Sequence, residues 1–261
     1  MSSEYRILFL GDVVGKPGRV AVREYLPHLK ELHTPLFTII NGENSAGGVG
    51  ITPDIANEFY QQGADAITLG NHAFNKREIM SYLESGKPIV RPVNMAQGVP
   101  GRGLCRVQKE GITLAVMNAC GRVYMDHYDD PFAAVDKMLD SLDTPHRFLD
   151  FHAEATSEKI AMGWHCAGRA TAVIGTHTHV QTADERILPG GTAYLSDSGM
   201  CGPWNSVLGM DREIILRRFR TGLPERFEVA QETGVISGVV ITVERETGRA
   251  LAIQRIAIGG D

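Results

Sequence analysis

The sequence predicts an α/β protein in which two sheets pack face to face with helices outside. Two observations favour this fold class. Apolar runs alternate with helical segments through much of the chain, which is the rhythm of a parallel sheet. The last part instead reads as alternating strands joined by turns, which favours antiparallel pairing. With 261 residues, 43% of them hydrophobic and 22% charged, the chain is expected to form one globular domain over residues 1–261.

The strands are predicted from short apolar runs bounded by turn residues. Their expected ranges, in chain order, are 5–10, 36–41, 65–70, 88–94, 103–108, 112–119, 147–151, 171–176, 185–188, 192–196, 226–230, 235–243 and 250–258. Residues 103–108 and 112–119 should form a hairpin around Gly111. Residues 197–210 are expected to be an irregular loop.

The helices are predicted from proline positions and from N-cap residues. Pro17 should open the first helix, and Pro27 should end or kink it. The next helix should begin at Thr52 and stop at Gly63. The later expected starts are Asn75 in a capping box with Glu78, Asp130 before Pro131, Thr156 or Ser157, and Asp211; the corresponding ends lie near Gly86, Leu142, Gly168 and Arg220.

Polar side chains follow five of the predicted strands at their carboxyl ends. Because ligands collect outside the carboxyl ends of strands in α/β proteins, these side chains should form one site. His177 and His179 are spaced i, i+2, which in an extended segment directs both rings to the same side. Singly, a histidine such as His152 would be read as a hydrogen-bonded core residue, but the joint placement favours a metal site. The seven candidate metal ligands are Asp12, Glu43, Asn44, Asn71, His152, His177 and His179.

Seven ligands are too many for one first-row ion, which takes roughly four to six. The set suits two divalent or mixed-valence ions that share a bridge, and the two oxygens of Glu43 can form it. Mixed oxygen and imidazole ligands favour iron, manganese or zinc, and the residues leave the choice among these open. Two such ions would lower the pKa of a bridging water towards ~7 and supply hydroxide to attack phosphorus. His72 is the candidate catalytic residue that protonates the leaving oxygen.

Charge, hydropathy and cysteine usage limit the partners. The formal net charge of -5 and the lack of a Lys/Arg run argue against a grip on duplex nucleic acid, whereas a small phosphate ester can be held by metal. No apolar run approaches the ~18 residues of a membrane span. The four cysteines are scattered, as expected of reduced thiols in the cytoplasm. We therefore expect a cytoplasmic protein without membrane partners, and its sequence is compatible with a homo-oligomer.

Two motifs resemble those of the calcineurin-like metallophosphoesterase superfamily, namely Gly70-Asn71-His72 and Gly175-Thr-His177-Thr-His179. The chain departs from the broad pattern at Val14, where Asp-x-His would have histidine, and at Ala73, where an acidic residue is common. Both departures match the YmdB-like bacterial phosphodiesterases. The other segments similar to that group are Ile7–Arg19, Asn41–Gly48, Asp150–Lys159 and Gly199–Pro203, and the similarity extends over about residues 5–258.

The resemblance implies a four-layer αββα sandwich of the metallophosphoesterase type, a di-metal centre that often holds iron, and hydrolysis of 2′,3′-cyclic nucleotides and other phosphodiesters. It further implies that loop 197–210 borders the site and that His72 is the proton donor. Phe74-Asn75 replaces the Trp-Asp common in the group, which concerns local substrate contacts. The implied ligands are Asp12, Glu43, Asn44 and His179 for one metal, and Glu43, Asn71, His152 and His177 for the other.

These observations leave three hypotheses about function. The first is a di-metal phosphodiesterase for small phosphodiesters, above all 2′,3′-cyclic nucleotides. The second is a phosphomonoesterase or nucleotidase with the same metals, because the residues do not fix how many esters the phosphorus carries. The third is a nucleotide-binding regulatory or RNA-associated protein in which turnover is incidental.

Overall fold

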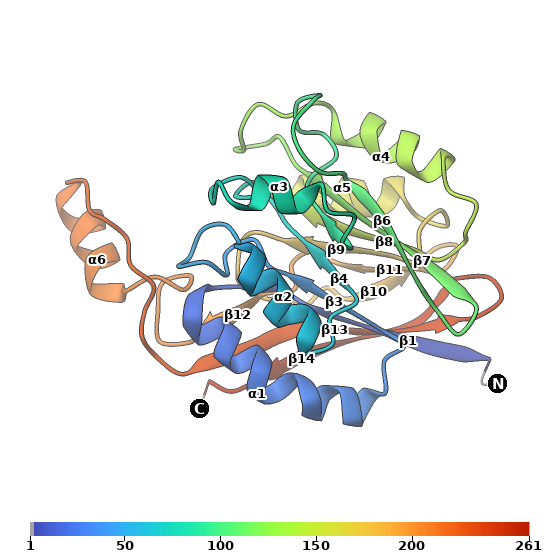
Figure 1. The fold of residues 1–261 in the computed structure, drawn as a ribbon, viewed down its shortest axis with the longest axis horizontal. Coiled ribbons are helices and arrows are strands. Elements are labelled where there is room, and N and C mark those ends of the chain that lie inside the picture. The colour runs from blue at the N-terminus through green and yellow to red at the C-terminus, as the bar shows by residue number, and fades with distance from the viewer. Residues whose placement is uncertain (1–2, 261) are drawn as a thin grey trace.

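The computed structural model describes residues 3–260, whose strands form two sheets (Figure 1). Within these residues the larger sheet has eight strands. Its spatial order is β2 (Asp12–Val13), β12 (Met200–Pro203), β13 (Gly234–Glu244), β1 (Glu4–Leu10), β3 (Phe37–Asn41), β4 (Ala66–Thr68) and β5 (Ile89–Val90), and β14 (Ala250–Ile258) pairs with β13. β1, β3, β4 and β5 are parallel, whereas β13 is antiparallel to both β1 and β14.

The smaller sheet has six strands within the same part of the chain. Its order is β10 (Arg186–Leu188), β11 (Thr192–Leu195), β9 (Ala172–Thr176), β8 (Arg147–His152), β7 (Ile112–Cys120) and β6 (Leu104–Lys109). The inner strands β7, β8, β9 and β11 are parallel, and β6 and β10 are antiparallel edges. The expected hairpin of β6 and β7 is confirmed, and Glu110 and Gly111 in its turn both have positive φ.

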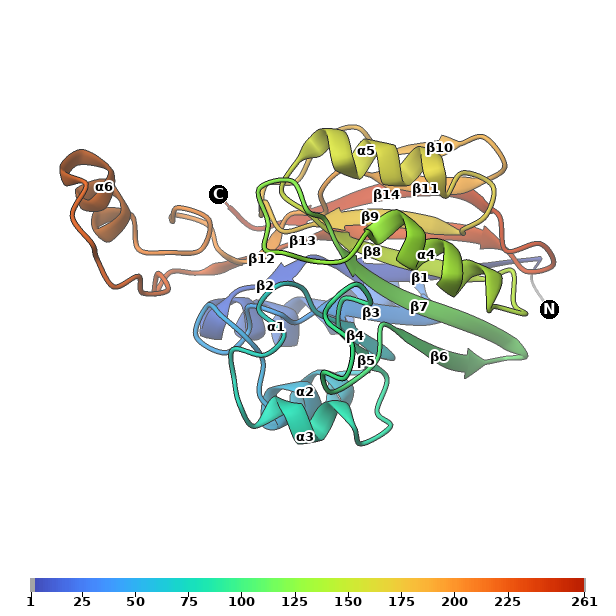
Figure 2. The ribbon, with the colours of Figure 1, turned by 90° about the horizontal axis from the view of Figure 1, so that it is seen from above.

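Helices lie on both sides of the paired sheets. They are α1 (Gly15–His33), α2 (Pro53–Gln61), α3 (Ile79–Leu83), α4 (Pro131–Asp140), α5 (Thr156–His165) and α6 (Arg212–Thr221). Figure 2 shows α1, α2 and α3 on one side and α4 and α5 on the other, while α6 stands away from the rest of the protein. Among the described residues, no helix combines the length and apolar character needed to cross a membrane.

Three buried clusters join these parts, because alternate residues of a strand face opposite sides of its sheet. In β1, Ile7 and Phe9 pack in a cluster with residues of the smaller sheet, whereas Leu8 and Leu10 pack with residues of α1 and α2. The rings of Phe9 and Phe148 lie 5.0 Å apart across the two sheets. A third cluster joins β7 and β8 to α4 and α5. The prediction that two sheets pack face to face is therefore confirmed.

Three expected helix boundaries are wrong. Pro27 does not end the first helix: α1 begins at Gly15 and continues to His33, because buried Leu26 and Leu29 on either side of the proline hold the helix against the sheet. Asn75 forms no capping box, since residues 71–78 make turns and α3 begins only at Ile79. Thr156 is the first residue of α5 and not its N-cap. In the first case tertiary packing overrides a local signal.

Two expectations for the final third of the chain are also wrong. The predicted loop 197–210 contains β12, which pairs with β2 and β13. The predicted strand 226–230 is absent from the described structure, where only an isolated bridge joins Val229 to Met210. The partners of β12 lie far away in the sequence, so a local pattern contains no sign of them. Strands β13 and β14 pair antiparallel, as expected, and both belong to the larger sheet.

The packing between the sheets predicts that Phe148→Ala lowers the free energy of unfolding by about 3–5 kcal/mol, because its fully buried ring fills the space beside Phe9. Urea denaturation followed by circular dichroism measures this change. Phe219→Ala is the matched control, since that ring on α6 is 77% exposed and its loss should cost within about 0.5 kcal/mol. Equal losses in both variants would contradict the proposed packing core.

Candidate metal centre

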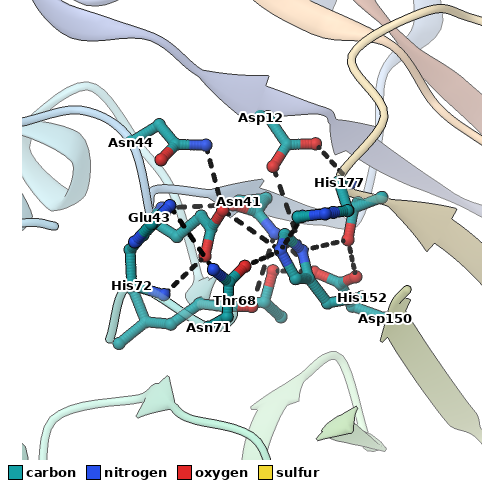
Figure 3. Close-up of polar contacts among 12 residues, drawn as sticks. Asp12, Asn41, Glu43, Asn44, Thr68, Asn71, His72, Asp150, His152 and His177 are labelled. Atoms are coloured by element: carbon teal, nitrogen blue, oxygen red, sulfur yellow. Dashed lines mark hydrogen bonds and ion pairs between the residues drawn. The ribbon is translucent and has the colours of Figure 1, made fainter. Parts of the chain in front are cut away.

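The carboxyl ends of strands from both sheets meet at one site (Figure 3). β1 leads to Asp12, β3 to Glu43 and Asn44, and β4 to Asn71 and His72. From the smaller sheet, β8 ends at His152 and β9 ends immediately before His177. Figure 3 shows their side chains converging, and all seven candidate ligands take part in contacts at this place.

His152 lies at the centre of a first group of contacts. Its Nε2 is 2.8 Å from Oδ1 of Asn71, 3.1 Å from Oε1 of Glu43 and 3.0 Å from Nδ1 of His177. Glu43, His152 and His177 each offer one ligand atom, and these three atoms lie within 4.8 Å of one another. A metal ion can be held by these three residues.

A second group overlaps the first at Glu43. Asn44 donates from Nδ2 to Oε1 of Glu43 over 2.9 Å, and the same Nδ2 is 3.1 Å from Nε2 of His179. Nε2 of His179 is 3.9 Å from Oδ1 of Asp12. Oδ1 of Asp12 and Oδ1 of Asn44 are buried without a hydrogen-bond partner among the described residues. Buried oxygens of this kind are costly unless a cation or donor faces them, so this donor set fits a metal ion.

The electrostatics of the first group favour metal-binding forms of Glu43 and His177. Burial lowers the pKa of His152, but the charge of Glu43 and its hydrogen bond raise that pKa to about 9, so metal binding at this ring releases a proton. Burial alone would raise the pKa of Glu43, but the charge of His152 and its hydrogen bond lower that pKa to about 2. Burial and then the charge of His152 lower the pKa of His177 to about 3, so its imidazole is neutral at physiological pH. An ionised carboxylate and a neutral imidazole are the forms that bind metals.

A hydrogen-bonded chain behind His152 fixes which ring nitrogen faces the site. The hydroxyl of Thr176 donates to Oδ1 of Asp150 over 2.6 Å, so it can only accept from Nδ1 of His152 at 2.8 Å. Nε2 is then the atom directed at the candidate ligands. Asp150 also accepts from Asn41 and Thr68 of the other sheet. Sequence reasoning missed the roles of Asp150, Thr176, Asn41 and Thr68, although such polar residues inside buried strands were the available signal.

The explanation expected for the two histidines is wrong, although both lie at the site. β9 ends at Thr176, and His177 and His179 have φ values of 100° and 65°, in the left-handed region that non-glycine residues seldom adopt. Their rings reach different neighbours, Nδ1 of His177 facing His152 and Nε2 of His179 facing Asn44. A turn therefore distributes the two imidazoles over both groups, which a continuous strand would not do.

A buried ion pair supports this turn. Asp197 accepts through Oδ2 from the backbone N–H and the hydroxyl of Thr178, over 3.1 and 2.7 Å. Lys159 neutralises the same carboxylate, with Nζ 2.7 Å from Oδ2. The interactions of Thr178 thus anchor the backbone between the two histidines, each of which has an uncommon conformation.

The site opens into a cavity of about 550 Å³. Glu43, Asn44, His72 and His177 line it, so the half-buried His72 side chain faces the same space as the candidate ligands. The backbone N–H of His72 donates to Oε2 of Glu43 over 3.1 Å, which ties this residue to the ligand group. Leu208 also lines the cavity, and its carbonyl lies 3.0 Å from Nδ1 of His179. The expectation that segment 197–210 borders the site is therefore confirmed.

Known proteins are similar to this chain in sequence and in fold. A sequence model of the YmdB-like protein family matches residues 8–256. The 2′,3′-cyclic-nucleotide 2′-phosphodiesterase of Bacillus subtilis (strain 168) is 54% identical over 258 residues, covering 98% of each chain. The crystal structure of a novel phosphatase from Mycoplasma pneumoniae has a TM-score of 0.94 and 32% identity, covering 99% of this chain and 94% of that one.

A hypothetical protein from Thermus thermophilus also has a similar crystal structure. Its TM-score is 0.92 and its identity 40%, with 97% of this chain and 98% of that chain covered. The family match spans most of the sequence, and each of these three relatives exceeds 30% identity over nearly its whole length. The chain therefore belongs to the family of YmdB-like proteins.

Proposed function

We propose that this protein is a metal-dependent phosphodiesterase that hydrolyses small phosphodiesters, with 2′,3′-cyclic nucleotides as its preferred substrates. The observation that carries the proposal is the group of Glu43, His152 and His177, whose ligand atoms lie within 4.8 Å of one another beside a cavity that Glu43 and His177 line. The 54% identical relative from Bacillus subtilis is named for hydrolysis of 2′,3′-cyclic nucleotides. The reaction adds one water molecule and breaks one of the two ester bonds of the cyclic phosphate.

The contacts support a site for two ions, with iron proposed first and manganese or zinc as alternatives. One ion would be held by Glu43, Asn71, His152 and His177, and the other by Asp12, Glu43, Asn44 and His179. Glu43 contacts members of both groups, which supports its role as the bridge. When bound, the ions supply a hydroxide nucleophile at neutral pH and neutralise charge on the phosphate oxygens.

His72 is proposed to give a proton to the leaving ribose oxygen. Its side chain lines the cavity, and its backbone N–H is held by Glu43, so the ring lies beside the ligand group without being one of the proposed ligands. Nε2 of His72 is 3.4 Å from Nδ2 of Asn71. Because the amide nitrogen of Asn71 donates in this contact, Nε2 of His72 accepts and the proton for the leaving oxygen would be carried on Nδ1, while Asn71 faces His152 with its oxygen.

Other features support finer statements about the molecule. The three buried clusters support a four-layer αββα sandwich of the metallophosphoesterase type, formed by one domain over residues 1–261. We also propose a cytoplasmic location, because all four cysteines are buried free thiols, which is typical of a reducing compartment.

Protein purified without added metal should contain about two transition-metal ions per chain and should lose hydrolysis of 2′,3′-cyclic AMP on chelation. Asp12→Asn and Glu43→Gln should each lower the metal content, and should lower the activity at least ~100-fold. Loss of a group that merely supports a ligand already lowers metal affinity or activity about 10- to 100-fold. Elemental analysis and product chromatography measure both quantities. Glu31→Gln, at an exposed carboxylate on α1, is the control and should match the parent protein.

Full hydrolysis in both Asp12→Asn and Glu43→Gln would refute the proposed metal site. Two bound metals without diesterase activity would support the metal site but exclude phosphodiesters as the substrates. In that case rates on p-nitrophenyl phosphate decide whether the chain is a phosphomonoesterase, the activity suggested by the novel phosphatase from Mycoplasma pneumoniae.

His72→Ala should lower kcat for 2′,3′-cyclic AMP by about 10²- to 10⁴-fold while metal content stays unchanged, because an alkoxide leaving group needs a proton. The loss should be much smaller for bis(p-nitrophenyl) phosphate, since p-nitrophenolate leaves without one. Steady-state rates on the two substrates test this difference, and His28→Ala at an exposed position is the control. An equal loss on both substrates would argue for a structural role of His72.

A further inference from the structure

We propose that Phe227 is the residue against which the nucleobase of the substrate stacks, an inference that rests on the proposed phosphodiesterase function. The cavity beside the metal ligands is lined by both polar and large apolar side chains. Glu43, Asn44 and His72 form its polar part, whereas Val180, Leu208 and Phe227 contribute large apolar side chains. A nucleotide has the same division, with an anionic phosphate at one end and an aromatic base at the other.

The apolar part of the cavity is unusually exposed. Val180 is 61% exposed, Leu208 48% and Phe227 44%. Apolar side chains gathered in this way are costly in water and mark surfaces that a ligand covers. A cavity of about 550 Å³ lies within the roughly 300–1,000 Å³ of small-molecule sites. Besides the imidazoles of His72, His177 and His179, Phe227 supplies the aromatic side chain among the residues that line it.

Backbone contacts hold Phe227 at a defined place. Its segment is hydrogen-bonded to the segment before α6, through Asp211 N–H to the carbonyl of Glu228 at 2.8 Å and Ala230 N–H to the carbonyl of Gly209 at 3.0 Å. Leu208, just before Gly209, contacts His179 of the candidate metal centre. The base of the projecting segment in Figure 1 is therefore tied to the metal site, even though α6 itself stands away.

Two packing contacts further position Phe227 and its segment. Met210 and Val229 pack against Gly48 in the loop that follows Glu43, where an added Cβ would lie 2.9 Å from each side chain. The guanidinium of Arg218 lies 5.0 Å from the ring centroid of Phe227 and restrains the ring. An aromatic ring held beside a phosphate site gives sequence-tolerant stacking, because every nucleobase has a π face.

The test compares two substrates that share the reacting group. They are 2′,3′-cyclic AMP and methyl ribofuranoside 2,3-cyclic phosphate, which has the ribose and the cyclic phosphate but no base. Phe227→Ala should raise KM for 2′,3′-cyclic AMP by about 5- to 150-fold, the equivalent of ~1–3 kcal/mol of stacking, with kcat nearly unchanged. The KM for the base-free substrate should not change. Phe227→Tyr keeps the aromatic face and should retain the parental KM.

Phe219→Ala, at a ring on α6 outside the cavity, is the control and should leave both KM values unchanged. An equal effect of Phe227→Ala on both substrates, or no effect on either, overturns the assignment of Phe227 while the phosphodiesterase function stands. Hydrolysis of neither substrate by the parent protein overturns the proposed function and this inference together. Phe227→Leu, with metal content and the melting curve measured beside it, covers the case in which Phe227→Ala unfolds.

Discussion

The hydrogen bonds of the Asp150 carboxylate are the interaction on which the site depends, because they join the two sheets at the edge where the ligands gather. Asp150 lies in β8, yet its Oδ2 accepts from Asn41 of β3 at 2.9 Å and from Thr68 of β4 at 2.5 Å. Burial raises the pKa of this carboxyl to about 7, and the hydrogen bonds from Thr176 and Thr68 oppose that shift. A buried carboxylate is tolerated only with such donors. Because two of the donors to Asp150 come from the other sheet, its hydrogen bonds are made only when the two sheets are aligned.

The hydrogen bonds of Asp150 also determine the geometry of the candidate metal centre. Oδ1 of Asp150 accepts from Thr176, and Thr176 in turn orients His152, so a residue outside the ligand set decides which imidazole atom faces the others. His177 and His179 follow in the sequence, and hydrogen bonds to Asp197 support their uncommon backbone conformations. Rigid support of this kind is what a metal site requires, because ligands must be held near their bound positions before an ion arrives.

Prediction from the sequence succeeded where a feature is local. The strand at Ala172–Thr176, the N-caps Thr52 and Asp130, and the β6–β7 hairpin all follow from neighbouring residues. It failed where a distant partner decides the outcome. β12 forms because β2 and β13 pair with it. Asn75 caps no helix, because the residues after β4 make turns that place Asn71 and His72 at the site.

The sequence by itself determined the alternation of strands and helices and the polar residues at the carboxyl ends, because periodicity and residue chemistry are written along the chain. The tertiary structure alone decided which atoms face one another. Glu43 and His152 lie far apart in the sequence but come within 3.1 Å only when two sheets align, and the same alignment leaves Oδ1 of Asp12 buried without a hydrogen-bond partner among the described residues. The approach of Phe227 to the site likewise depends on long-range hydrogen bonds, which no local pattern contains.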